Sequence, residues 1–165
     1  MDRSRAERLS LRIALATQTL TLERSGRPLG TYTVSTSKHG AGEARGSFKT
    51  PRGRHVVRAK IGGAAPLNAV FRGRRPTGEI YTPELARLNP DRDWILTRIL
   101  WLSGTEIGRN RLGLVDTMRR YIYIHGTPDS EPLGSPSSIG CIRMANRDIV
   151  ELFDLVVPGT IVDIA

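Results

Sequence analysis

Short runs of β-prone residues, separated by polar turns, constrain the fold of this chain more than any other feature of its sequence. Near the start, apolar side chains recur at every second position: Leu11, Ile13 and Leu15, then Leu20 and Leu22, then Tyr32 and Val34. A period of two is typical of strands that bury one face. The intervening segment ERSGRPLG supplies Gly and Pro for a hairpin turn, so we expect antiparallel strands here.

The rest of the chain adds strands and one clear helix. HVVRAKIGG, PGTIVDIA and RRYIYIHG each predict a strand, the last of them ending at His125. RDWILTRILWLSG is mostly β-branched and aromatic, which favours a strand over a short helix. NRDIVELFDLVV has the apolar spacing of a helix, with Asn146 as its expected N-cap. We therefore expect a mainly β fold with one or two short helices, a β-sandwich or barrel.

Residues 62–93 interrupt the strand pattern and are rich in Gly, Pro and Arg. Four prolines make a long helix there unfavourable, so we expect a lid-like excursion from the sheet. The 165 residues suffice for one ordinary domain with its own core. We expect residues 1–165 to form a single catalytic domain.

The positive charge is concentrated in the first part of the chain. The net charge is +9; residues 1–60 hold 13 Lys+Arg and 4 Asp+Glu, and residues 61–165 hold 12 of each. Residues 45–75 contain no acidic side chain, which fits either a site for phosphates and acidic polymers or a solvated basic surface. Aromatics are only 5% and no nucleic-acid module is present, so we expect no nucleic-acid partner.

The sequence also leads to an expectation about location. No apolar run approaches the length that crosses a membrane, and the first twenty residues lack the apolar stretch and cleavage site of a signal peptide. We expect a cytoplasmic protein without a membrane partner. The alternative is a periplasmic protein whose precursor has lost its signal.

The single cysteine, Cys141, lies in a Gly- and Ser-rich loop, sixteen positions after His125. A cysteine nucleophile needs a base, a group that orients the base, and donors for an oxyanion. His125 is placed to be the base, and the Gly126 carbonyl can accept the second imidazole proton and fix the tautomer. The competing interpretation is an inert, buried thiol.

The neighbours of Cys141 favour the catalytic interpretation. Gly140 lets the main chain bend close to a substrate, and the N–H groups around Cys141 can then point at an oxyanion. Arg143 either lowers the thiol pKa or clamps a substrate carboxylate. Other candidates are expected to be structural or solvated: His39, His55, Arg74, Arg75, Trp94, Trp101, Asp129 and Glu131. For Arg74 and Arg75 the alternative is a contact with substrate carboxylates.

The stretch HGTPDSEPLGSPSSIGCIRMANRDIVELFDLV resembles the signature of the L,D-transpeptidase catalytic domain, the YkuD family. The matching positions are His125, Gly126, Thr127, Ser138, Gly140, Cys141, Ile142, Arg143, Met144, Asn146 and Asp148. A second stretch, GSFKTPRGRHVV, is similar to another segment of the family through Gly46, Phe48, Thr50, Pro51 and Gly53. The resemblance extends roughly from Leu11 to Ile164.

The resemblance implies a β-rich fold and a substrate, the tetrapeptide stem of peptidoglycan or a muropeptide. In the family the thiolate attacks the carbonyl between the third stem residue, often meso-diaminopimelate, and D-alanine. At the matching positions, the resemblance implies that Cys141, His125 and Gly126 are catalytic. It also implies that Gly140, Arg143 and Ser138 bind the oxyanion or the substrate. It implies no metal or organic cofactor.

The resemblance leaves the acyl acceptor and the oligomeric state open. Water gives an L,D-carboxypeptidase of muropeptide recycling, which is our first expectation, and an amine gives an L,D-transpeptidase that forms 3–3 cross-links. A non-catalytic basic binding module is the third hypothesis. The chain departs from many members at Ile139, where they have a histidine two residues before the cysteine. This removes one hydrogen-bond donor.

Overall fold

The computed structural model describes residues 8–165, and within that range it contains one ten-stranded sheet. The first seven residues, on which the expectation about a leader partly depends, lie outside the described residues. The strands are β1 Leu9–Ala14, β2 Thr19–Arg24, β3 Arg27–Ser35, β4 Gly53–Ile61, β5 Ala69–Arg72, β6 Arg75–Ile80, β7 Ile95–Gly104, β8 Tyr123–Thr127, β9 Ile142–Ala145 and β10 Ile161–Ile164.

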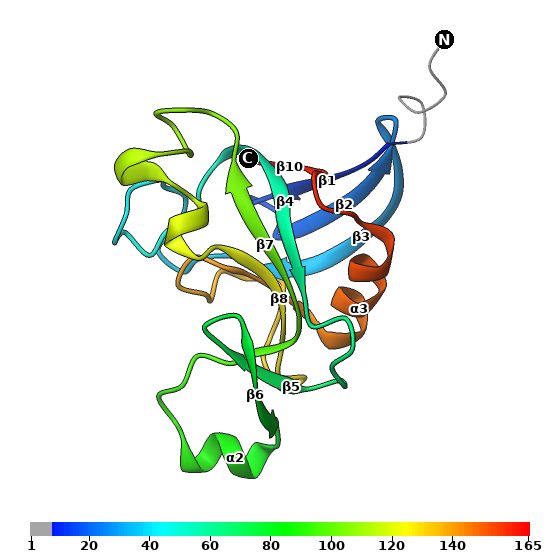
Figure 1. Ribbon diagram of the computed structural model, residues 1–165, viewed down its shortest axis with the longest axis vertical. Helices are drawn as coiled ribbons and strands as arrows, with labels where there is room; N and C mark the ends of the chain where they lie inside the picture. Colours follow the sequence, from blue (N-terminus) through cyan, green and yellow to red (C-terminus); the bar gives the residue numbers. More distant parts are fainter. Residues whose placement is uncertain (1–7) are drawn as a thin grey trace.

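The sheet closes on itself. Its order is β4-β10-β1-β2-β3-β9-β8-β7-β5-β6, and β4 also pairs with β7. This last pairing joins the two sides of the sheet into a barrel, while β5 and β6 extend beyond it (Figure 1). Closure removes the free edges that an open sheet would present. The predicted mainly β sandwich or barrel is confirmed.

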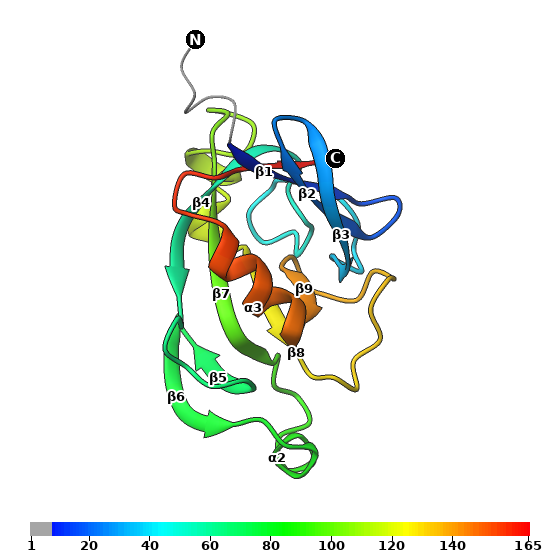
Figure 2. The same ribbon diagram turned by 90° about the vertical axis from the view of Figure 1, so that its right-hand side faces the viewer.

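Alternation along the strands separates the core from the surface, as the period of two predicts. Leu11, Ile13, Leu20, Leu22 and Val34 are almost inaccessible and belong to one apolar core. Helix α3, Asn146–Leu155, adds the apolar stripe of Ile149, Leu152 and Phe153 to the same core. It packs against β7, β8 and β9 and lies across that part of the barrel in Figure 2.

Two sequence-based boundaries are wrong. Strand β8 does not end at His125 but continues to Thr127, because its parallel pairing with β9 extends to that residue. Asn146 does not cap α3: the cap position is Ala145, which makes no side-chain capping bond. Asn146 is the first helical residue, and its side chain is buried in a hydrogen-bond network with other groups.

Residues 62–93 leave the barrel as predicted, in the form of a hairpin and one short helix. Strands β5 and β6 are joined by Gly73 and Arg74, both with positive φ, as a two-residue type I′ turn requires. Helix α2, Pro83–Leu88, is capped by the side chain of Thr82, whose Oγ1 accepts from the Leu85 N–H at 3.1 Å. This segment forms the lower part of the molecule in Figure 1.

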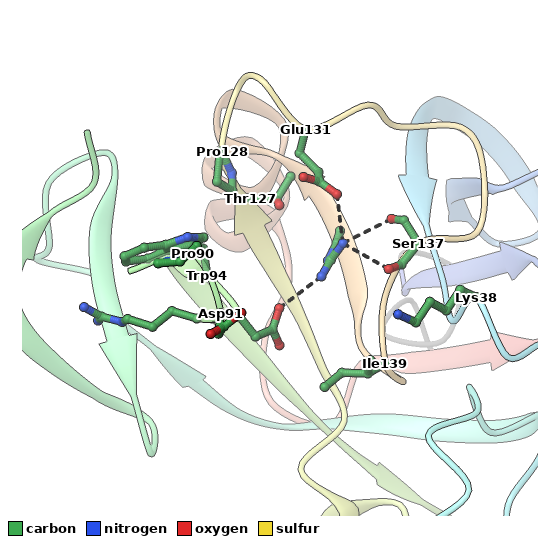
Figure 3. Close-up of a pocket in the computed structure, with 12 residues that line it drawn as sticks. Lys38, Pro90, Asp91, Trp94, Thr127, Pro128, Glu131, Ser137 and Ile139 are labelled. Carbon is green, nitrogen blue, oxygen red and sulfur yellow. Dashed lines mark hydrogen bonds and ion pairs between the residues drawn. The ribbon is translucent and has the colours of Figure 1, made fainter. Parts of the chain in front are cut away.

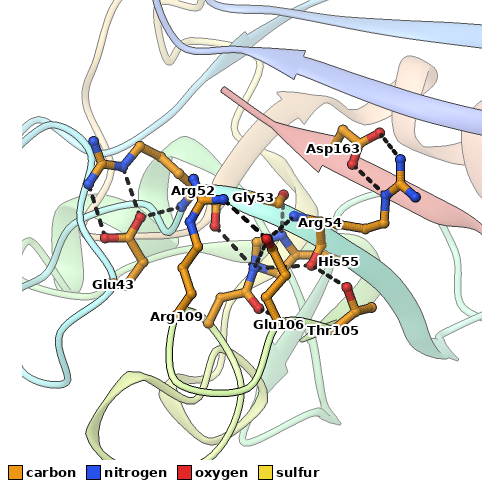
Figure 4. Close-up of polar contacts among 10 residues, drawn as sticks. Glu43, Arg52, Gly53, Arg54, His55, Thr105, Glu106, Arg109 and Asp163 are labelled. Atoms are coloured by element: carbon orange, nitrogen blue, oxygen red, sulfur yellow. Dashed lines mark hydrogen bonds and ion pairs between the residues drawn. The ribbon is translucent and has the colours of Figure 1, made fainter.

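His55 on β4 is a packing residue, with no exposed surface. Its Nδ1 lies 3.0 Å from the Gly53 carbonyl, and its Nε2 lies 2.9 Å from Thr117 Oγ1. Figure 4 shows the surrounding ion pairs, Arg54 with Asp163 and Arg109 with Glu106. Burial lowers the pKa of His55 to about 4, against the opposing effects of the Gly53 carbonyl and of nearby carboxylates.

The buried His55 makes the free energy of unfolding depend on pH. The unfolded chain binds the histidine proton near pH 6.5, whereas the folded chain binds it only near pH 4. The contribution is therefore complete above about pH 6.5 and is lost as the pH falls toward 4, by at most about 3 kcal/mol. Urea unfolding at pH 7.0 and pH 4.5 measures it.

The variant His55→Gln removes this titration, because glutamine carries no proton in that range. We expect it to be less stable than the parent at pH 7, and to lose less stability between pH 7.0 and 4.5. Equal losses in both proteins would show that His55 does not cause the pH dependence. His39→Gln is the matched control, since His39 is exposed.

Candidate functional site

The pairing of β8 with β9 assembles the candidate active site on one face of the barrel wall. In β8, Tyr123 and His125 point to one side, while Ile124 points into the core. The parallel register places His125 beside Arg143 and Ile124 beside Ile142. Cys141 therefore lies next to Tyr123, on the same face as His125. The face that carries His125, Cys141 and Arg143 is the candidate catalytic face. The strand register thus brings two residues sixteen positions apart in the sequence onto one face of neighbouring strands.

The imidazole of His125 has the tautomer that a general base acting through Nε2 requires. Its Nδ1 lies 2.6 Å from the Gly126 carbonyl oxygen, which can only accept, so the Nδ1–H group donates and Nε2 carries the lone pair. Nε2 is buried and has no hydrogen-bond partner. Burial lowers the pKa of His125, opposed by Asp93 and by the Gly126 carbonyl, so the ring is neutral near pH 7.

The thiol of Cys141 is held by the main chain of the segment that leads into β8. Sγ–H donates to the Tyr121 carbonyl at 3.3 Å, and the Tyr123 N–H donates to Sγ at 3.3 Å. Burial raises the pKa of the Cys141 thiol to about 12, although the Tyr123 N–H, Arg143 and Arg120 each act to lower it. The predicted effect of Arg143 has the expected sign, but burial outweighs it. The resting site therefore pairs a neutral thiol with a neutral imidazole.

The loop that carries the thiol is braced by hydroxyl groups. Ser138 Oγ donates to the Cys141 carbonyl at 2.5 Å and accepts from the Gly140 N–H at 3.2 Å. Thr50 Oγ1, from the second matching stretch, donates to the Gly140 carbonyl at 2.9 Å. Gly140 has a φ of +133°, which favours glycine. Ser138 thus shapes the loop, and the roles of Gly140 and Cys141 N–H groups toward an oxyanion stay predictions.

Both terminal nitrogens of Arg143 are bound by protein groups, and the dashed lines from the labelled Glu131 and Ser137 in Figure 3 mark some of these contacts. Its Nη1 donates to Glu131 Oε1 at 3.0 Å and its Nη2 to Asp93 Oδ1 at 3.0 Å. Nη1 also donates to the carbonyl of Ser137 at 3.2 Å. A substrate carboxylate would have to displace one of these partners, so this geometry does not favour a carboxylate clamp. Glu131, expected in a solvated loop, instead bonds to the catalytic face.

A charged cavity of about 280 Å³ adjoins Arg143. In Figure 3, Pro90 and Trp94 form one wall, and Lys38, Ser137 and Ile139 form the other. Ile139, the departure from the family pattern, therefore lines this cavity with an apolar side chain. The cavity lies beside the catalytic face rather than over the thiol, because neither His125 nor Cys141 is among its lining residues.

A buried amide braces the main chain at His125, although the local pattern predicted a helix cap for the same residue. Asn146 Nδ2 donates to the Thr127 carbonyl at 2.9 Å, and its Oδ1 accepts from Thr97 Oγ1 at 2.6 Å. Thr97 has a positive φ of 74° and lies in a bulge of β7 opposite His125 and Gly126. A bulge at this place re-aims the neighbouring strand. The only sequence signal was the position of Asn146 in the motif.

Two of the remaining candidates also lie on the catalytic face. The ring of Trp101 meets the ring of Tyr123 edge to face at 6.2 Å, and Arg74 lies over the face of Trp101 at 4.8 Å. His39 and Arg75 are exposed. Residues 8–165 contain no group of three or more His, Cys, Asp or Glu side chains that could hold a metal ion, and no helix long enough to cross a membrane.

Comparison with known families gives a match over nearly the whole chain. The model of the L,D-transpeptidase catalytic domain, YkuD, matches residues 10–164. A putative L,D-transpeptidase YkuD of Bacillus subtilis is 36% identical over 89 residues, 54% of this chain and 44% of that protein. The corresponding protein of Bacillus licheniformis is 46% identical over 46 residues, 28% of each chain. The matches thus span less than half of these relatives.

Solved structures share the fold. An L,D-transpeptidase from Mycobacterium smegmatis superimposes with a TM-score of 0.57 at 19% identity, over 95% of this chain and 58% of that one. An L,D-transpeptidase in complex with imipenem gives 0.58 at 20% identity, over 96% of this chain and 59% of that one. At these identities the likeness establishes the fold alone.

Gly126→Ala tests how closely the backbone behind the base is packed. A Cβ at Gly126 would lie 2.4 Å from Asn146 Oδ1 and 2.7 Å from the Leu96 carbonyl oxygen, so β8 must shift. Overpacking of this kind costs about 1–3 kcal/mol. We expect that loss in urea unfolding. Gly30→Ala is the control, since Gly30 also lies in a strand but a Cβ there would have no neighbour within 4 Å. Equal stability of both variants would contradict this.

Alkylation by iodoacetamide tests the protonation state of Cys141. A thiol with a pKa of about 12 is almost entirely protonated at pH 7.5. Allowing for the greater nucleophilicity of a more basic thiolate, we expect a rate roughly 100-fold below that of N-acetylcysteine. The rate should keep rising above pH 9. A plateau below pH 9, measured by mass spectrometry over time, would show that the resting thiol has an ordinary pKa.

Proposed function

The chain belongs to the family of L,D-transpeptidase catalytic domains, and we propose that it catalyses acyl transfer from peptidoglycan tetrapeptide stems through Cys141. The observation that carries this is the free, buried Nε2 of His125 on the same face as the only thiol of the chain. The bond cleaved joins the third stem residue to D-alanine. The substrate class follows from the family, whose members act on such stems.

Because the thiol of Cys141 and the imidazole of His125 are both neutral at rest, the thiol proton must move to the imidazole during the attack. His125 Nε2 removes the Sγ proton as Sγ attacks the carbonyl carbon of the third residue, forming an oxyanion and an imidazolium. Asp93, which favours the protonated ring, stabilises the imidazolium. The intermediate collapses when the carbon–nitrogen bond breaks and His125 gives the proton to the leaving amine of D-alanine. A thioester on Cys141 remains.

We propose hydrolysis as the main fate of this thioester, which makes the protein an L,D-carboxypeptidase of muropeptides. His125 then takes a proton from water as the water oxygen adds to the thioester carbonyl carbon. The carbon–sulfur bond breaks, the proton returns from His125 to Sγ, and the tripeptide is released. The cavity of about 280 Å³ adjoins Arg143 rather than the thiol. Hydrolysis needs only access of water to the thioester. A second stem with its sugars would need more room. Action on free muropeptides accords with a cytoplasmic location, which we propose with it.

Cross-linking is the second candidate, favoured by the names of the relatives, which are L,D-transpeptidases. In that reaction the amine of an acceptor stem replaces water. Mass spectrometry of the products from disaccharide-tetrapeptide, with and without an acceptor stem, separates the two reactions. Tripeptide plus D-alanine supports hydrolysis, and a dimer joined through two third residues supports transfer.

The catalytic assignment predicts that Cys141→Ala and His125→Ala each lose D-alanine release by at least about a thousand-fold, because each removes a bond-making or proton-transferring group. Unfolding measurements establish that the variants fold. His39→Ala is the matched control and should keep full activity, since His39 is exposed and has no part in the proposed chemistry. Substantial turnover by folded Cys141→Ala protein would disprove the assignment.

Imipenem offers an independent measurement of the nucleophile. One relative was solved in complex with this carbapenem, so we expect it to acylate this chain. Intact-mass spectrometry should show one adduct on the parent protein and none on Cys141→Ala. An adduct that persists in the alanine variant would place the reactive group elsewhere.

A further inference from the structure

We propose that Arg74, at the tip of the β5–β6 hairpin, binds the terminal carboxylate of the residue that leaves. This inference rests on the proposed function, since it concerns the D-alanine beyond the cleaved bond. An enzyme that removes a terminal residue gains selectivity when a cation recognises the terminal carboxylate. The structure offers three arginines around the nucleophile, and their hydrogen bonds distinguish them.

Arg143 and Arg120 have their terminal nitrogens occupied. Arg143 bonds to the carboxylates of Asp93 and Glu131, which neutralise it. Arg120 donates to the main-chain carbonyls of Gly42 at 3.2 Å and Lys49 at 2.6 Å, and so braces a loop. A carboxylate that bridges Nη1 and Nη2 of either guanidinium would compete with these bonds.

The guanidinium of Arg74 is held in place by aromatic residues, but not all of its hydrogen-bond donors are used. Its guanidinium carbon lies 4.8 Å from the ring centre of Trp101 and 4.6 Å from that of Tyr121, and Nη1 donates to the hydroxyl of Tyr123 at 3.0 Å. Among residues 8–165, its Nε and Nη2 have no hydrogen-bond partner, and no carboxylate pairs with it. Stacking fixes the plane of the guanidinium and leaves donors for a carboxylate.

The same two tyrosines contact both groups: their side chains contact the guanidinium of Arg74, and their main chains contact the thiol of Cys141. The Tyr123 N–H donates to Cys141 Sγ, and the Tyr121 carbonyl accepts from it, so the residues that hold Arg74 also hold the nucleophile. The leaving carboxylate is one residue beyond the attacked carbonyl, and one residue spans about 3.8 Å. A cation held by the residues that also contact the thiol suits that carboxylate.

The backbone conformation of the hairpin turn is unusual for an arginine at position 74. Arg74 has a positive φ of 63°, the second such residue of a two-residue turn after Gly73. Asparagine or glycine would fit that position with less backbone strain, so an arginine there is held by its side-chain contacts. The neighbouring Arg75 is exposed and pairs with Arg72 across the hairpin ladder.

The test compares two substrates in three proteins. The substrates are a tetrapeptide ending in D-alanine and the same peptide ending in D-alaninamide, and the proteins are the parent, Arg74→Gln and Arg75→Gln. Charge-assisted hydrogen bonds predict that Arg74→Gln lowers the preference for the acid over the amide, as a ratio of kcat/KM values, by about 10- to 100-fold. Cleavage of the amide should stay within about threefold. Arg75→Gln should keep the parent's preference.

A binding measurement tests the site without turnover. The indole N–H of Trp101, followed by NMR, reports titration with N-acetyl-D-alanine or N-acetyl-D-alaninamide. We expect the acid to shift this resonance, the amide to bind at least about tenfold more weakly, and Arg74→Gln to abolish the difference. Arg74→Lys keeps the charge without the planar fork and should give an intermediate preference.

The two measurements separate the two proposals. If the parent releases no D-alanine yet binds N-acetyl-D-alanine through Arg74, the proposed function fails and the carboxylate site stands. If the parent releases D-alanine and the folded Arg74→Gln variant keeps both the acid preference and the binding difference, the carboxylate site is overturned. Thermal unfolding of each variant shows whether it is folded.

Discussion

The parallel pairing of β8 with β9 is the interaction on which the site depends. It sets which side chains share a face, and a shift of one residue would turn Cys141 or His125 into the core. The register is fixed by burial of Ile124 and Ile142 on the opposite face. The same strand register therefore determines both the packing of the core on one face and the positions of the catalytic residues proposed for the other.

Burial has opposite consequences for the pKa values of His125 and Cys141, and both suit the proposed acyl transfer. It disfavours the imidazolium and the thiolate alike, so the resting pair is uncharged. Charge appears only when the thiol proton moves, and fixed groups are already in place for it: Asp93 for the ring, and the Tyr123 N–H for the sulfur. Such preorganisation favours the reacting state over the resting one.

The sequence predicted the strands and the late helix, because periodicity is a local signal. The motif predicted His125 and Cys141 as the reacting pair, a role that stays a prediction. The sequence did not predict partners that lie far apart along the chain. Asp93 meets Arg143 only because the excursion returns to β7 beside the catalytic strands. Asn146 has the local pattern of a cap, but a buried network with Thr97 offers its amide stronger partners. Such choices between competing partners depend on tertiary packing.

The place of β10 has a consequence for how the chain acquires its fold. This strand lies between β1 and β4, pairing parallel with one and antiparallel with the other, although both precede it by about a hundred residues or more. Until residues 161–164 emerge from the ribosome, β1 and β4 each present an unpaired edge. Closure of the barrel therefore follows the synthesis of its other strands, and the nascent chain depends on protection of those edges until β10 arrives.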